Sequence, residues 1–137
     1  MILVDTSVII DFLRNRQNAK VEVFDDVMES KIPWGISEFV YQEVLQGARD
    51  EKEFGKLREY FDTVPVYFLK YGKVSFERAA MLNLRCRSAG VTVRSTVDLL
   101  IAETAIENEV FLLHNDSDFT YMAGVLSELR LYKERIT

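Results

Sequence analysis

Acidic residues of this 137-residue chain stand where hydrophobic segments end or helical patterns begin. Asp5 follows the apolar run ILV, Asp98 opens the stretch DLLIAETA, and Asp116 and Asp118 follow the run VFLL. Glu43 lies inside the segment EFVYQEVLQG. Carboxylate oxygens are the ligands that Mg²⁺ and Mn²⁺ prefer, and such ions activate water for phosphodiester hydrolysis. The first question is therefore whether the fold brings these acids together.

Short apolar runs alternate with longer segments of helical periodicity. We expect strands at 2–4, 32–36, 64–68, 110–113 and, more weakly, 129–132, and helices at 7–14, 19–30, 38–47, 50–62, 72–89 and 97–108. This alternation predicts an α/β fold in which helices cover both faces of a central, mainly parallel sheet. No linker, repeat or low-complexity segment interrupts it, so residues 1–137 are expected to form one domain.

The acids fall where such a sheet binds ligands. In open α/β sheets, ligands bind beyond the carboxyl ends of the strands, where Asp5 and Asp116 are expected. Two carboxylates about 4 Å apart at an effective dielectric near 20 repel by roughly 4 kcal/mol, so a cluster needs a cation to offset it. The chain has one cysteine and one histidine, and an all-oxygen ligand set favours Mg²⁺ or Mn²⁺ over zinc.

Each acid also has a purely structural explanation. Ser95 and Asp98 have the spacing of a capping box, which stabilises a helix start. Asp116 or Asp118 could cap a short following helix, and Glu43 could be an ordinary solvated helix residue. The N-terminal aspartate could be a turn residue, although a carboxylate between two core segments needs a partner. The residues alone leave both interpretations open.

The charge balance limits how the chain could bind a nucleic acid. A net charge of −5 gives no overall attraction to phosphate, so binding requires a local basic patch or a bound cation. Residues 78–97 contain no acid but hold four arginines, and this basic segment ends beside Asp98. We expect Arg85 and Arg94 to guide RNA phosphates toward the acids. The alternative is a solvated helix face.

Composition excludes several other classes. A hydrophobic content of 48% with 28% charged residues is typical of a globular protein, and no apolar run approaches a membrane span. The apolar N-terminus is interrupted by Asp5 and lacks a basic start, so we expect no signal peptide and a cytoplasmic location.

Two other classes of α/β protein lack their motifs here. Haloacid-dehalogenase-like phosphatases need a second aspartate where Ser7 stands. Receiver domains need an aspartate where the chain has LKY after VPVYF.

Four segments together resemble one known family. LVDTSVIIDFL, EVLQG, DLLIAETA and LLHNDSDF, in this order, resemble the PIN-domain ribonucleases, and most closely the VapC-type toxins of bacterial and archaeal toxin–antitoxin pairs. The resemblance covers nearly the whole chain and implies a PIN-like three-layer α/β/α domain. It also implies that Asp5, Glu43, Asp98 and Asp116 gather to hold one or two Mg²⁺ or Mn²⁺ ions. Among these, we expect Asp5 and Asp98 to bind the principal ion directly.

The resemblance extends to residues around the four acids. Asp118 matches a further acid that often follows the fourth, and Thr6 and Ser7 match a hydroxyl pair that supports the ligands without binding the ion. One departure is His114-Asn115, which stands where similar proteins commonly carry a threonine. A hydroxyl contribution at that place is therefore not expected.

The family also implies an activity and partners. The chain is expected to be a Mg²⁺-dependent endoribonuclease toxin that cuts RNA, is blocked by an antitoxin protein, and assembles as a homodimer or a toxin–antitoxin hetero-oligomer. Apolar residues within 19–62, including Val27, Met28, Phe54 and Tyr60, could line a groove for a partner helix or could face the core. The rival prediction is a catalytically idle PIN-like module that binds RNA or a partner protein.

Overall fold

The computed structural model describes residues 1–133. Its elements in chain order are β1 (Ile2–Val4), α1 (Thr6–Leu13), α2 (Ala19–Glu29), β2 (Trp34–Ser37), α3 (Glu38–Gln46), α4 (Glu51–Phe61), β3 (Val66–Tyr67), α5 (Lys73–Ser88), α6 (Thr96–Glu107), β4 (Phe111–Leu113) and α7 (Ser117–Val125). The first four predicted strands and all six predicted helices are confirmed, with ends shifted by two residues or fewer.

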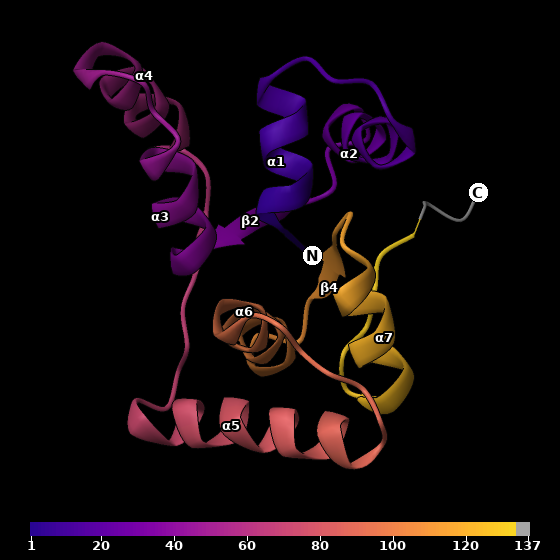
Figure 1. The fold of residues 1–137 in the computed structure, drawn as a ribbon. Helices are drawn as coiled ribbons and strands as arrows, with labels where there is room; N and C mark the ends of the chain where they lie inside the picture. Colours follow the sequence, from indigo (N-terminus) through magenta and orange to yellow (C-terminus); the bar gives the residue numbers. More distant parts are fainter. Residues whose placement is uncertain (134–137) are drawn as a thin grey trace.

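The four strands form one sheet in the order β3-β2-β1-β4, and every pairing is parallel. Helices α1 and α2 lie on one side of the strands, and α5 and α6 lie on the other (Figure 1). The interior strand β1 is covered on both faces, so Ile2, Leu3 and Val4 are all buried. This explains why its sequence is an unbroken apolar run rather than an alternating one. The predicted three-layer α/β/α fold is confirmed.

Parallel pairing brings the ends of distant segments to one edge of the sheet. The backbone N–H of Asp5, directly after β1, donates to the carbonyl of Leu113, the last residue of β4, at 2.9 Å. Helix α1 begins from the first of these ends and α7 from the loop after the second. The segments that carry Asp5 and Asp116 are therefore neighbours although 111 positions separate them.

The prediction of a strand at 129–132 is wrong. Only Leu131 pairs with Leu112, as an isolated parallel bridge beside β4. Two backbone hydrogen bonds hold it, from Leu112 N–H to Arg130 O and from Tyr132 N–H to Leu112 O. The predicted strand at 64–68 is confirmed only as a two-residue strand, because Pro65 has no N–H to donate to a neighbouring strand.

Apolar residues in 19–62 divide between the core and the surface. Val27 is fully buried in the core, so the suggestion that it lines a partner groove is wrong. Met28 is half-buried, whereas Phe54 and Tyr60 on α4 are exposed. Among residues 1–133, no helix combines the length and apolar character needed to cross a bilayer.

Two glutamates lie inside the contact between α5 and α6. Glu107 Oε1 accepts hydrogen bonds from the Lys70 N–H at 2.8 Å and from the Ser75 hydroxyl at 3.0 Å. Glu103 lies one turn earlier on the same helix and is only 3% exposed. Burial and a hydrogen bond to Glu107 raise the pKa of Glu103 to about 8, whereas hydrogen bonds hold the pKa of Glu107 below its ordinary value. At neutral pH the two carboxyl groups therefore share one proton.

Candidate metal centre

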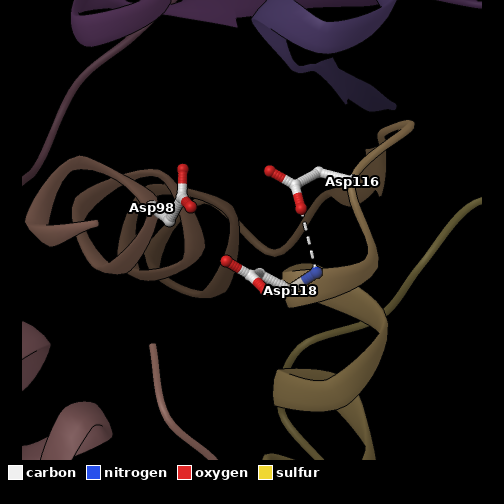
Figure 2. A group of neighbouring side chains, drawn as sticks. All are labelled: Asp98, Asp116 and Asp118. Atoms are coloured by element: carbon white, nitrogen blue, oxygen red, sulfur yellow. Dashed lines mark hydrogen bonds between the residues drawn. The ribbon is translucent and has the colours of Figure 1, made fainter. Parts of the chain in front are cut away.

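Three aspartates from two helices meet at the carboxyl edge of the sheet. Asp98 comes from the first turn of α6, whereas Asp116 and Asp118 come from the start of α7. One oxygen from each of the three lies within 4.8 Å of the others, and Figure 2 shows the side chains converging. We call Asp98, Asp116 and Asp118 the three-carboxylate group.

The start of α7 fixes two members of this group. Asp116 is the N-cap residue, and its Oδ1 accepts the Asp118 N–H at 2.9 Å. The other Asp116 oxygen points toward Asp98 (Figure 2). The capping role predicted for Asp116 is thus confirmed, and it coexists with a place in the acidic site. Capping uses one carboxylate oxygen and leaves the second directed at the site.

Asp98 is half-buried and faces several other acids. The predicted capping box is absent, because Ser95 occupies the N-cap position of α6 without a side-chain capping hydrogen bond. Burial first, and then the negative charges of Asp5, Asp116, Asp118 and Glu43, raise the pKa of Asp98 to about 7. Burial and the surrounding acids thus disfavour the charged form of Asp98. A bound cation would stabilise that charged form.

Asp5 is buried and held in one orientation by its neighbour Ser7. Its Oδ2 accepts the Ser7 N–H at 3.1 Å and the Ser7 hydroxyl at 2.6 Å, so Asp5 caps α1. Burial raises the pKa of Asp5, with a smaller contribution from the charge of Asp116. The same Ser7 oxygen accepts the Asn115 N–H at 2.8 Å, which links α1 to the loop after β4.

Glu43 reaches the same region from α3. Its side chain is exposed, yet partial burial of the carboxyl group and the nearby charge of Asp5 raise its pKa. The nearby Thr6 hydroxyl lowers this pKa. Among residues 1–133 the Thr6 hydroxyl is buried without a hydrogen-bonding partner. All four acids expected at the site therefore influence one another. Asp5 and Glu43 lie outside the compact three-carboxylate group.

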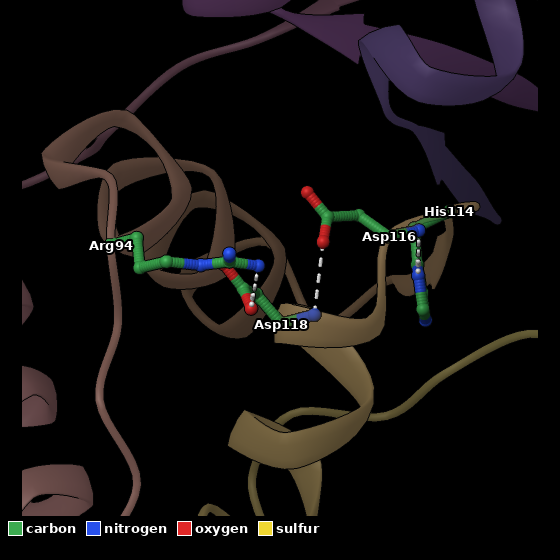
Figure 3. Close-up of polar contacts among 4 residues, drawn as sticks. All are labelled: Arg94, His114, Asp116 and Asp118. Atoms are coloured by element: carbon green, nitrogen blue, oxygen red, sulfur yellow. Dashed lines mark hydrogen bonds and ion pairs between the residues drawn. The ribbon is translucent and has the colours of Figure 1, made fainter.

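The two arginines expected to guide RNA phosphates have different surroundings. Arg94, in the loop before α6, pairs with Asp118 through Nη2–Oδ1 at 3.0 Å and Nε–Oδ2 at 3.3 Å (Figure 3). Arg85 instead forms a two-bond ion pair with Glu128, beyond α7. Arg85 lines a pocket of about 520 Å³, and Glu103 and Glu107 line the same pocket.

His114 has a structural role. Its Nδ1 accepts the Asp116 N–H at 3.1 Å (Figure 3), and its ring packs against Phe119. Burial lowers the pKa of His114 to about 4, so the ring is neutral at physiological pH. The histidine thus orients the loop that carries Asp116.

Sequence reasoning missed the pairing of Arg94 with Asp118 and placed Asp118 behind the other acids. A signal for its position existed, because the N-cap residue of a helix and the residue two positions later both stand at the helix N-terminus. With Asp116 as the cap, Asp118 had to lie close to it. No comparable signal linked it to Arg94, 24 positions earlier in an irregular loop.

The donor set fits a hard divalent cation. The three-carboxylate group offers only oxygen, and Asp5 and Glu43 add acids within electrostatic range. Mg²⁺ needs few protein ligands because it retains several waters, so a group of this size is sufficient. Burial is the first cause of the raised pKa values of Asp5, Glu43 and Asp98, and the charges of neighbouring acids add to it. A bound cation would favour the charged form of each carboxyl group.

Comparison with known proteins assigns the chain to a family. The family model described as "PIN domain" matches residues 2–125, and the chain belongs to this family. Among its relatives, VapC ribonuclease Mb1587 of Mycobacterium bovis and ribonuclease VapC11 of Mycobacterium tuberculosis are each 32% identical over 126 residues, covering 91% of this chain and 93% of theirs. The chain is therefore a VapC-type PIN domain, as its sequence motifs predict.

Solved structures agree with this assignment of the fold. VapBC2 of Rickettsia felis bound to a promoter DNA fragment matches with a TM-score of 0.72 at 16% identity, covering 96% of this chain and 98% of that one. A toxin–antitoxin complex from Klebsiella pneumoniae matches with a TM-score of 0.69 at 20% identity, covering 96% and 100%.

Proposed function

We propose that this chain is a metal-dependent endoribonuclease and acts as the toxin of a VapBC-type toxin–antitoxin system. The observation that carries the proposal is the convergence of Asp98, Asp116 and Asp118 on a PIN fold, with Asp5 and Glu43 close enough to perturb them. The ribonuclease names of two relatives with 32% identity support the reaction class.

Each acid has a distinct part in this proposal. Asp5, Asp98 and Asp116 bind the ion, Mg²⁺ or Mn²⁺. Asp5 and Asp116 each use one oxygen to cap a helix and have a second oxygen for the ion, whereas Asp98 takes no part in capping. When bound, the ion lowers the pKa of a water molecule and offsets charge on the phosphoryl group. Glu43 has a raised pKa and a side chain that reaches solvent, which suits a group that completes the ligand set or accepts the proton of the attacking water.

The hydroxyl residues beside Asp5 position it. Ser7 donates two hydrogen bonds to one Asp5 oxygen, which fixes the direction of the other. Thr6 interacts with Glu43 and favours its charged form. Arg94, at the rim of the three-carboxylate group, would bind substrate phosphate. Arg85 is a weaker candidate, because Glu128 already occupies its guanidinium.

A cleavage assay tests the activity. Mixed single-stranded RNAs incubated with Mg²⁺ or Mn²⁺ should be cut, and EDTA should stop the reaction. Asp98→Asn should reduce cleavage at least about 100-fold, as expected when a residue that holds the ion is lost. Asp62→Asn, at an exposed position after α4, is the matched control and should cut normally. RNA binding without metal-dependent cleavage would favour the idle binding module instead.

The proposed partner is an antitoxin protein that blocks the acidic site, in a homodimer or a hetero-oligomer. The structural neighbours include toxin–antitoxin and VapBC complexes. A negatively charged site attracts an arginine or lysine side chain, which gives a physical basis for blocking. If a neighbouring gene encodes a small protein, the Asp98→Asn protein expressed together with that protein should co-purify with it in a defined stoichiometry. Purification of each protein alone would contradict the partnership.

A further inference from the structure

The Arg94–Asp118 pair has one buried and one exposed end. Asp118 has a side chain only 8% exposed, whereas the Arg94 side chain is 74% exposed. The guanidinium donates through Nη2 and Nε to the two carboxylate oxygens, a fork arrangement that fixes orientation as well as distance. The buried acid therefore holds the inner edge of a solvent-facing guanidinium (Figure 3).

This pairing separates Asp118 from the other two members of the three-carboxylate group. Both Asp118 oxygens receive a hydrogen bond from Arg94. A divalent ion bound to the same carboxylate would lie against the positive guanidinium, which costs electrostatic energy. In the described part of the chain, Asp98 and Asp116 form no ion pair. Asp118 is thus neutralised internally, while its two neighbours remain available to a cation.

The pairing also leaves Arg94 with unused donors. A guanidinium has five N–H groups, and Asp118 occupies two of them. The others lie on the exposed side of a residue whose charge also interacts with Asp98 and Asp116. Planar guanidinium donors suit phosphate oxygens. Of the other arginines in the basic segment, Arg78 stacks on Tyr71 and Arg85 pairs with Glu128.

We infer that Asp118 is a positioning residue rather than a metal ligand, and that it holds Arg94 at the rim of the metal centre to bind an RNA phosphate. This inference rests on the proposed ribonuclease function and assigns the two residues to substrate binding. Charge alone separates the alternatives. Removing a negative charge next to RNA should strengthen binding, so weaker binding after loss of Asp118 must come from a misplaced Arg94.

RNA binding without cleavage is the first measurement. A fluorescent single-stranded RNA is titrated in EDTA at several salt concentrations with Arg94→Gln, Asp118→Asn and the double variant. Each single variant should bind about fivefold to twentyfold more weakly, and the double variant should be no weaker than Arg94→Gln. Arg94→Gln should also lower the salt slope by about one. Arg87→Gln, exposed in the last turn of α5, is the control for charge.

Mn²⁺ binding without RNA is the second measurement. The double variant removes one charge of each sign, so net charge cannot change its metal affinity. We expect its calorimetric Mn²⁺ affinity to stay within about twofold of the parent, and Asp98→Asn to lose tenfold or more. An equal loss in the double variant would make Asp118 a metal ligand and overturn the inference.

Two further outcomes separate this inference from the proposed function. If the parent cuts RNA but Arg94→Gln and Asp118→Asn bind it normally, the positioning role is wrong and the nuclease proposal stands. If the parent neither binds nor cuts RNA, both fail.

Arg94→Lys is a further test, because lysine keeps the charge but cannot form two hydrogen bonds to one carboxylate. If Arg94→Lys bound RNA as tightly as the parent, Arg94 would act only through its positive charge and the positioning role of Asp118 would be wrong. Arg94 is exposed, so its variants test the inference even if Asp118→Asn folds poorly.

Discussion

Replacing Glu103 with glutamine should stabilise the protein at alkaline pH and have little effect in acid. Glu103 is buried between α5 and α6. The Glu107 Oε2 atom is buried and has no hydrogen-bonding partner in residues 1–133 apart from the proton that Glu103 can donate. A glutamine amide donates to Glu107 in the same direction at every pH. The substitution therefore fixes permanently the hydrogen bond that the shared proton provides only at lower pH.

The sign follows from the direction of the pKa change. Glu103 has an ordinary pKa of 4.5 in the unfolded chain and about 8 in the fold. The folded state thus keeps a proton that the unfolded state loses, and stability falls as pH rises from about 4.5 through 8. Neighbouring charges act in both directions, since Arg78 of α5 favours the charged form of Glu103 and Glu128 opposes it.

The pKa difference sets an upper bound on the size of the effect. At 1.36 kcal/mol per pH unit, it corresponds to at most about 5 kcal/mol above pH 8. The lowered pKa of Glu107 offsets part of this. We expect Glu103→Gln to gain roughly 2 kcal/mol at pH 9 and less than about 1 kcal/mol at pH 5. For a chain of this length, that gain raises the melting temperature by about 6 °C at pH 9.

Thermal melts followed by circular dichroism in EDTA, from pH 5 to pH 9, measure this difference. Glu77→Gln is the control, because it replaces a glutamate at an exposed position on α5. The difference in melting temperature between this control and the parent should be the same at pH 5 and pH 9. A Glu103→Gln protein that is equally destabilised at pH 5 and pH 9 would refute the shared proton. It would show that the glutamate carboxyl group matters for packing alone.

Four further outcomes follow from the structure. Asp98→Asn should stabilise the metal-free protein by about 1–2 kcal/mol at pH 8 and not at pH 4, because the raised pKa of Asp98 makes stability fall as pH rises through about 7; urea unfolding in EDTA measures this. Mg²⁺ should raise the melting temperature of the parent as its concentration increases. At 100 times the dissociation constant, the free energy of unfolding should rise by about 2.7 kcal/mol. Asn18→Ala should cost about 1 kcal/mol in urea unfolding, since the Asn18 side chain caps two N–H groups of α2. Gly35→Ala should lower the melting temperature sharply, because a new Cβ would lie 2.5 Å from the Pro65 carbonyl oxygen.

The fold was readable from the sequence because its signals are local and repeated. The run ILV predicts a strand buried on both faces, and β1 is one of the two interior strands of the sheet. Parallel pairing then dictates that Asp5 and Asp116 emerge at the same edge. The segment 129–132 misled because an apolar pattern cannot show whether a neighbouring strand offers more than one pairing position, and Leu112 offers one.

The candidate site was readable only in part. The spacing of Ser95 and Asp98 fits a capping box, but the structure turns Asp98 toward other acids instead. Arg85 and Arg94 both belong to the basic segment 78–97, yet Glu128 binds one and Asp118 the other. These pairings depend on how loops distant in sequence pack together, which local periodicity does not encode. Charge patterns therefore identify which residues could act, and tertiary packing selects which of them meet.

The Ser7 hydroxyl has a consequence for how this site can vary. It donates to Asp5 and accepts from the backbone of Asn115, so a single oxygen atom joins the N-terminal acid to the loop that carries Asp116. An insertion between β4 and Asn115 would withdraw the Asn115 amide from the Ser7 oxygen and break the link between the two segments, while Ser7 would still bond to Asp5. Redesign of the loop must therefore preserve its backbone path up to residue 115 while changing side chains beyond it.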